Sequence, residues 1–127
     1  MVTLTREDVE AIWDVMTPLQ RAAALVLIEA QGRERAIHVP VIAARVGCNG
    51  RILQDAVKDM VEIFGLPIGT GSEGLWWMVE PEEFDAVIGN LTDRGLSNLT
   101  HAGAVRRIAG RLFPNRYADA TGQGRLF

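Results

Sequence analysis

Apolar residues recur every three or four positions along most of the chain, which is the spacing of one face of an α-helix. This pattern predicts a mostly α-helical protein. Ile12, Trp13 and Met16 lie on the first such stripe, and Thr5 is its candidate N-cap. The expected helices cover residues 5–16, 17–31, 40–46, 51–64 and 80–113.

The second of these helices has the clearest local signals. Thr17 and Gln20 are spaced as a capping box, and Pro18 occupies the first helical position between them. Gly32 suits the left-handed turn that closes a helix. Because residues 22–30 are apolar on most sides, we expect this helix at the centre of the core.

The last predicted helix is long and interrupted by glycines. Its apolar stripe runs from Phe84 to Leu112, and Pro114 ends it. Each internal glycine weakens a helix by about 1 kcal/mol relative to alanine, so Gly95 is a candidate bend. Such a helix can lie across its own domain or pair with a second copy, and the homodimer remains open.

Three short strands are expected between the helices. Residues 36–39 form one candidate, and residues 66–68 and 75–79 form a hairpin around the Gly-rich loop 69–74. Trp76 and Trp77 are adjacent on the last strand and therefore face opposite sides. We expect one of them in the core.

The sequence predicts one domain, followed by a long helix and a C-terminal tail. Residues 1–79 form the expected domain, 80–113 the long helix, and 114–127 a polar, flexible tail. Charge is segregated: residues 1–48 carry −1, 49–93 carry −7 and 94–127 carry +5, which sum to the net −3. The acidic middle argues against a general nucleic-acid coat, while the basic end permits phosphate contacts.

Several functions are disfavoured by what the sequence lacks. The only cysteine, Cys48, and the two histidines, His38 and His101, have no metal-ligand spacing. There is no Gly-rich phosphate loop or catalytic triad pattern, so we expect neither an enzyme nor a cofactor. Without a secretion signal or an apolar run of membrane length, a cytoplasmic protein is expected.

The order helix, glycine turn, helix, hairpin resembles a winged helix-turn-helix domain over about residues 18–79. Ala43 and Gly47 carry the resemblance, since a small residue four places before the turn glycine lets the two helices approach. The whole chain is similar to small winged-helix proteins of bacteriophages and prophages. The resemblance implies a mostly α-helical winged helix-turn-helix fold with a small β-hairpin wing.

In such domains the second helix of the pair reads base edges in the major groove of double-stranded DNA. Arginine, asparagine and glutamine side chains suit that chemistry, and hydroxyl groups suit phosphates. The resemblance assigns base reading to the second helix and phosphate contacts to Arg45 and the hairpin. The implied DNA-binding residues are Arg45, Asn49, Arg51, Gln54, Asp55, Lys58, Thr70 and Ser72.

A protein-binding role competes with this reading. Arg51 is followed four residues later by Asp55, and Lys58 by Glu62, so each cation has an acid within reach. Asp59 adds repulsion toward DNA. Winged-helix domains also serve as protein-binding modules, and both roles remain open.

The residues Gln123, Leu126 and Phe127 resemble the Gln-x-x-Leu-Phe peptide that docks bacterial replication and repair proteins on the DNA polymerase sliding clamp. Gly124 and Arg125 stand where Leu and Ser or Asp are more common. The resemblance implies that the glutamine amide fills a polar site while leucine and phenylalanine enter an apolar cleft.

Three functions follow from these resemblances. The first is a DNA-binding protein recruited to the replication machinery through the clamp. The second is a phage-type transcriptional regulator with an incidental tail, and the third is a clamp-binding adaptor or inhibitor that does not bind DNA.

Overall fold

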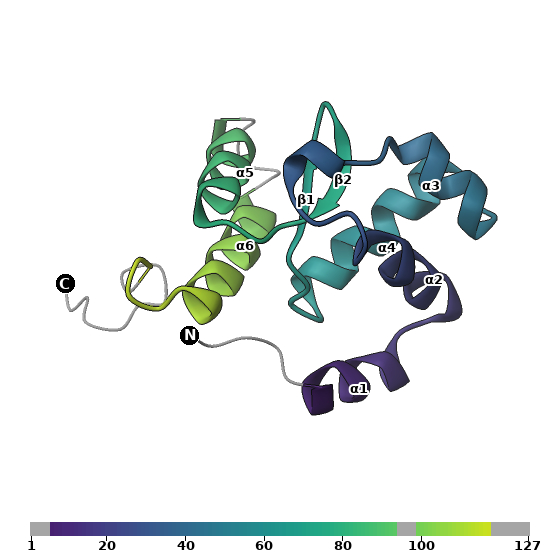
Figure 1. Cartoon of the computed structure of the whole chain (residues 1–127), viewed down its shortest axis with the longest axis horizontal. Helices are drawn as coiled ribbons and strands as arrows, with labels where there is room; N and C mark the ends of the chain where they lie inside the picture. Colours follow the sequence, from purple (N-terminus) through teal and green to yellow (C-terminus); the bar gives the residue numbers. More distant parts are fainter. Residues whose placement is uncertain (1–5, 94–98, 118–127) are drawn as a thin grey trace.

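The computed structural model describes residues 6–93 and 99–117 and is mostly helical, with a small antiparallel sheet (Figure 1). Both features agree with the sequence prediction. The elements in chain order are α1 (Arg6–Val15), α2 (Pro18–Leu27), the 3-10 turn η1 (Arg33–Arg35), α3 (Val39–Val46), α4 (Gly50–Glu62), β1 (Ile68–Gly71), β2 (Gly74–Trp77), α5 (Pro81–Asp93) and α6 (Leu99–Leu112).

The hairpin pairs β1 with β2 through a short turn at Ser72 and Glu73. The predicted third strand, residues 36–39, is reduced to one antiparallel bridge from Ile37 to Leu75 of β2. Two backbone hydrogen bonds of 2.9 Å join these residues. The segment ends there because His38 is already the N-cap of α3.

Helices α3 and α4 meet at a sharp turn. Gly47 has a φ of 81°, in the left-handed region that glycine adopts without strain. Both Gly47 and Cys48 donate backbone hydrogen bonds to the carbonyl oxygen of Ala43, at 2.9 and 3.0 Å. Ala43 is buried, so the small side chain predicted at this crossing packs between the helices.

The expected single helix over residues 80–113 is wrong. The structure has two helices, α5 and α6, which pack against each other (Figure 1). Gly95, the predicted bend, lies outside the described residues. The apolar stripe is therefore folded back on itself, and Phe84 and Val87 of α5 and Val105 and Ile108 of α6 are buried.

The α5–α6 pair also contacts β1 and α4, so its stripe packs on its own domain. Trp76 is buried with only 1% of its surface exposed, whereas Trp77 is partly exposed, as the alternation along β2 predicts. A continuous core includes Leu27 of α2, Ile42 of α3, Leu53 of α4, Leu75 of β2, Phe84 of α5 and Val105 of α6.

Helix α2 departs from its expected place at the centre of the core. Its capping box forms, with Gln20 and Thr17 exchanging hydrogen bonds of 3.0 and 3.1 Å. Only one face is buried, however, and Leu25 and Ile28 are 59% and 43% exposed. The prediction that Gly32 closes this helix is also wrong, because α2 ends at Leu27 and Gly32, with a φ of 94°, instead precedes η1.

The segment after α6 folds back on the start of α5. Phe113 packs edge-to-face on Phe84, with ring centroids 5.7 Å apart. The Tyr117 hydroxyl lies 2.6 Å from Asp85 Oδ1 and 2.8 Å from the carbonyl oxygen of Pro81. Arg116 binds the other oxygen of Asp85 at 2.8 Å, so residues 113–117 belong to the folded domain and not to a tail.

Tyr117 offers a spectroscopic test of this docking, because it is the only tyrosine in the chain. Burial, and next its hydrogen bond to Asp85, raise the pKa of Tyr117 from 10.0 to about 12. The stabilisation from the neutral phenol is complete below the unfolded value and is lost as the pH rises through about 12. We expect the tyrosinate absorbance of the folded protein to have its midpoint near pH 12.

The Asp85→Asn variant is the control, since it removes the charge that opposes tyrosinate. Its midpoint should fall while circular dichroism reports a folded protein. A midpoint near the ordinary tyrosine value in the folded wild type would show that Tyr117 is not docked on α5.

Candidate nucleic-acid interface

The outer face of α4 is exposed along its first two turns and beyond. Leu53, Val57 and Met60 anchor the helix in the core. The predicted DNA-binding side chains on this helix all lie on the opposite, exposed side. They are Arg51, Gln54, Asp55 and Lys58.

Asn49 has a structural task at the start of α4. It is the N-cap, and its side-chain oxygen accepts a hydrogen bond of 2.9 Å from the backbone N–H of Ile52. This bond satisfies one of the free N–H groups of the first helical turn. The oxygen that a bidentate contact with adenine needs is therefore already engaged in the helix cap, with one lone pair left to accept a second bond.

The acids four residues along α4 do not neutralise its cations. Within residues 6–93 and 99–117, neither Arg51 nor Lys58 forms an ion pair. Glu62 instead contacts His101 of α6, with Oε2 and Nδ1 2.7 Å apart. The cationic groups of α4 thus stay available to a partner, although Asp55 and Asp59 share the exposed side.

The structure brings three of the predicted residues together and separates the others. Gln54 and Lys58 of α4 and Thr70 of β1 line the same pocket. Ser72 lies in the exposed hairpin turn, and its hydroxyl approaches Glu73 at 3.4 Å. Arg45 is exposed in the last turn of α3 and does not line this pocket.

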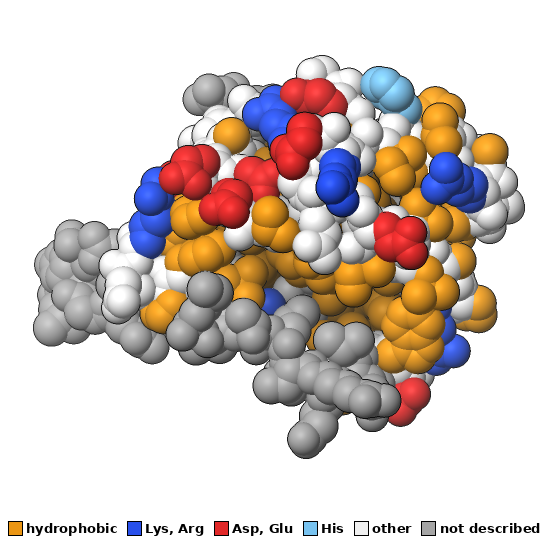
Figure 2. Space-filling view, in the orientation of Figure 1, with side chains coloured by type: hydrophobic (Ala, Val, Ile, Leu, Met, Phe, Trp, Pro, Cys, Tyr) orange, Lys and Arg blue, Asp and Glu red, His pale blue; other side chains and the backbone are white. Residues whose placement is uncertain are grey.

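Opposite charges are interspersed on the neighbouring surface. Figure 2 shows acidic and basic side chains side by side over α5 and the hairpin. At the hairpin, Arg33 binds Glu73 at 2.8 Å, and this hydrogen bond lowers the pKa of the Glu73 carboxyl from its ordinary value. Because both signs of charge are mixed on this surface, it offers no continuous basic patch to DNA. Any DNA contact is therefore limited to a few side chains.

Three of the four arginines between residues 99 and 117 serve the fold. Arg111 donates to the carbonyl oxygen of Gly65 at 2.7 Å, and Arg106 to the hydroxyl of Thr92 at 3.3 Å. Arg116 is held by Asp85, and this contact lowers the pKa of Asp85 together with the larger effect of Tyr117. Their phosphate-binding role is thus less favoured than their structural one.

His101 is a pocket residue that the sequence interpretation missed. It is 39 residues from its partner Glu62, and no local pattern joins them. Only the packing of α6 on α4 brings the imidazole beside Lys58.

Gln123, Leu126 and Phe127 lie outside the described residues, so their interpretation stays a prediction. Among the residues described, no three His, Cys, Asp or Glu side chains gather as metal ligands. In the same part of the chain, none of the helices has the length and apolar character required to cross a bilayer. Comparisons with protein-family models, curated proteins and solved structures found no match to this chain.

Proposed function

We propose that the protein is a winged-helix protein that binds double-stranded DNA and is recruited to the replication machinery through the sliding clamp. The observation that carries the DNA-binding part is the exposed side of α4 beside the hairpin, where Arg51 and Lys58 form no ion pair with any residue of 6–93 and 99–117. The bridge from Ile37 to β2 supports the winged-helix part, because it adds a third strand position next to the hairpin.

The roles of the residues follow from their positions. Arg51 lies in the first turn of α4 and carries the bidentate donor group that suits guanine. Gln54 and Lys58 lie one and two turns further, toward the hairpin. Arg45 and Ser72 flank this surface as candidate phosphate contacts.

The clamp part rests on the Gln123, Leu126 and Phe127 spacing alone. Burying a leucine and a phenylalanine contributes about 1.5–3 kcal/mol each, from which the cost of ordering the peptide is subtracted. A weak contact of this kind gains affinity when a second site on the same DNA holds the protein nearby.

The test is DNA binding measured by fluorescence anisotropy with a labelled duplex. Wild-type affinity should fall steeply between about 50 and 200 mM salt, because phosphate contacts release counterions. Arg51→Gln should weaken binding about tenfold. Arg107→Gln removes the same charge from an exposed position that lines a separate depression at the α4–α6 seam, and it should change affinity by less than about twofold.

A protein-binding adaptor is the second candidate, and one observation favours it. The exposed side of α4 also carries Asp55, Asp59 and the half-exposed Ile52. Acidic and apolar groups suit a protein partner better than a phosphate backbone. Absence of any duplex binding at low salt would favour the adaptor over the proposed function.

A further inference from the structure

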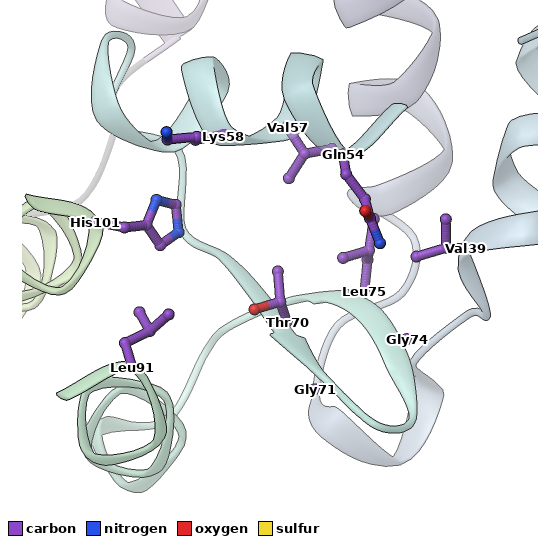
Figure 3. A pocket seen from close by; sticks show the side chains of 10 residues that line it. All are labelled: Val39, Gln54, Val57, Lys58, Thr70, Gly71, Gly74, Leu75, Leu91 and His101. Carbon is purple, nitrogen blue, oxygen red and sulfur yellow. The ribbon is translucent and has the colours of Figure 1, made fainter. Parts of the chain in front are cut away.

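A pocket of about 270 Å³ lies between α4, the hairpin and the facing ends of α5 and α6 (Figure 3). Apolar side chains form part of its lining, with Val57, Leu75 and Leu91 among them. The complete lining consists of Val39, Gln54, Val57, Lys58, Thr70, Gly71, Gly74, Leu75, Leu91 and His101.

The polar groups of this pocket come from three different elements. Gln54 and Lys58 come from α4, Thr70 from β1 and His101 from α6, and Figure 3 shows them around one opening. They offer an amide, an ammonium group, a hydroxyl and an imidazole. Among the residues that the structure describes, no acid lines the pocket, although Asp55 and Asp59 lie on the same helix. The pocket therefore favours an anion.

His101 is held in a fixed orientation. Its Nδ1 is 2.7 Å from Glu62 Oε2, and the two side chains are only 12% and 19% exposed. In Figure 3 the free edge of the ring, with its second nitrogen, is turned toward the pocket. A carboxylate that binds one imidazole nitrogen fixes the ring and leaves the other nitrogen for a ligand.

The size of the pocket limits the ligand. Sites for drug-sized molecules occupy roughly 300–1,000 Å³, so a pocket at or below the lower limit suits one small group. A tetrahedral phosphate with part of its sugar fits this description. A duplex backbone passing between α4 and the hairpin would present such groups along the opening.

We infer that this pocket binds one phosphate group of the DNA backbone through Lys58, Thr70 and His101. The inference rests on the proposed DNA-binding function and adds α6 to the interface. Lys58 supplies the charge, and the Thr70 hydroxyl donates a hydrogen bond. His101 donates from Nε2 when the ring is doubly protonated, while Nδ1–H stays with Glu62.

This arrangement couples DNA affinity to pH. Neutral His101 with its proton on Nδ1 presents an Nε2 lone pair to the phosphate, whereas the imidazolium presents a donor. The groups facing His101 are Glu62 and Lys58 of α4, Thr70 of β1 and Leu91 of α5. Glu62 and Lys58 are the charged groups among them.

The experiment compares DNA affinity at about pH 6 and pH 8, across the ordinary range of imidazole titration. Wild type should bind about tenfold more tightly at the lower pH, the effect of one charge-assisted hydrogen bond. His101→Gln should remove this difference. His38→Gln is the matched control, because His38 is the other histidine, is exposed and lies outside the pocket, and it should behave as wild type.

Two further measurements separate phosphate binding from a structural role. Lys58→Gln should lower the slope of log affinity against log salt by about 1 at both pH values. Thermal unfolding of His101→Gln should confirm that the variant is folded. If His101→Gln weakens DNA binding equally at both pH values, and Lys58→Gln leaves the salt slope unchanged, His101 has a packing role alone and the inference is overturned.

The source of the phosphate is tested in a separate arm. Inorganic phosphate is added to the wild-type protein, and the His101 ring resonances are followed by NMR. Shifts with inorganic phosphate and none with duplex would assign the pocket to a free anion and overturn the backbone assignment.

If duplex binds but His101→Gln keeps the wild-type pH dependence, the inference fails while the proposed function stands. If no duplex binds at either pH, the proposed function itself fails.

Discussion

Replacing Gly74 by alanine is expected to destabilise the protein by about 3–5 kcal/mol. A Cβ at this position would lie 2.1 Å from the carbonyl oxygen of Ile37, which is backbone and has no rotamer to yield. Gly74 also has a φ of 117°, which L side chains rarely adopt. The change would open the bridge between Ile37 and Leu75 and lose its two hydrogen bonds.

The measurement is urea unfolding followed by circular dichroism. A domain of this size has a total stability of about 5–15 kcal/mol, so the variant should lose a large part of it and unfold at a clearly lower urea concentration than wild type. Gly89→Ala is the matched control. It lies exposed within α5 with no atom within 4 Å of an added Cβ, and the change should stabilise the protein by about 0.5–1 kcal/mol.

If Gly74→Ala costs less than about 1 kcal/mol, the close approach of Ile37 to the hairpin is not maintained in solution. The third strand position and the pocket between α4 and the hairpin would then lose their support. The result therefore bears on the fold independently of any DNA measurement.

Replacing Leu126 and Phe127 together by alanine is expected to reduce binding to a purified bacterial sliding clamp by at least about a hundredfold. Each side chain contributes about 1.5–3 kcal/mol when buried, and every 1.4 kcal/mol is a factor of ten in affinity. The measurement is surface plasmon resonance with immobilised clamp and the full-length protein. Wild-type binding in the micromolar range, about −8 kcal/mol, is the expected upper limit.

Arg125→Ala is the control for this experiment. Arg125 lies between Gln123 and the apolar pair, outside the three positions of the motif, and its replacement should leave clamp binding nearly unchanged. DNA affinity of the double variant should also equal that of wild type. Retention of clamp binding by the double variant would remove the tether and leave the transcriptional regulator as the better hypothesis.

A protein that contacts both DNA and the clamp can function with weak affinity for each. On α4 itself, Arg51 and Lys58 carry positive charge toward DNA, and Asp55 and Asp59 oppose them. A clamp that encircles the same duplex raises the local concentration of the domain, so weak DNA binding becomes sufficient. Loss of the DNA contact or of the clamp contact should then weaken binding to clamp-loaded DNA. The loss should exceed what the affinity for DNA alone or for the clamp alone indicates.

Local backbone signals in the sequence determined the start of α2 and the end of α3. The capping box of Thr17 and Gln20 and the sharp turn at Gly47 are set by neighbours within four residues, and both are confirmed. Strand alternation likewise predicted one of the two tryptophans in the core, and Trp76 is buried while Trp77 is half-buried. These features need no distant contact, which is why residue type and spacing suffice to predict them.

Tertiary packing decided what local spacing left open. An apolar stripe from Phe84 to Leu112 satisfies one long helix or two packed ones equally, and contact between α5 and α6 selects the second. The exposure of Leu25 is likewise set by which elements cover α2, not by its own helix. The pairing of Glu62 with His101 joins groups 39 residues apart, and such a contact exists only once burial has fixed both helices.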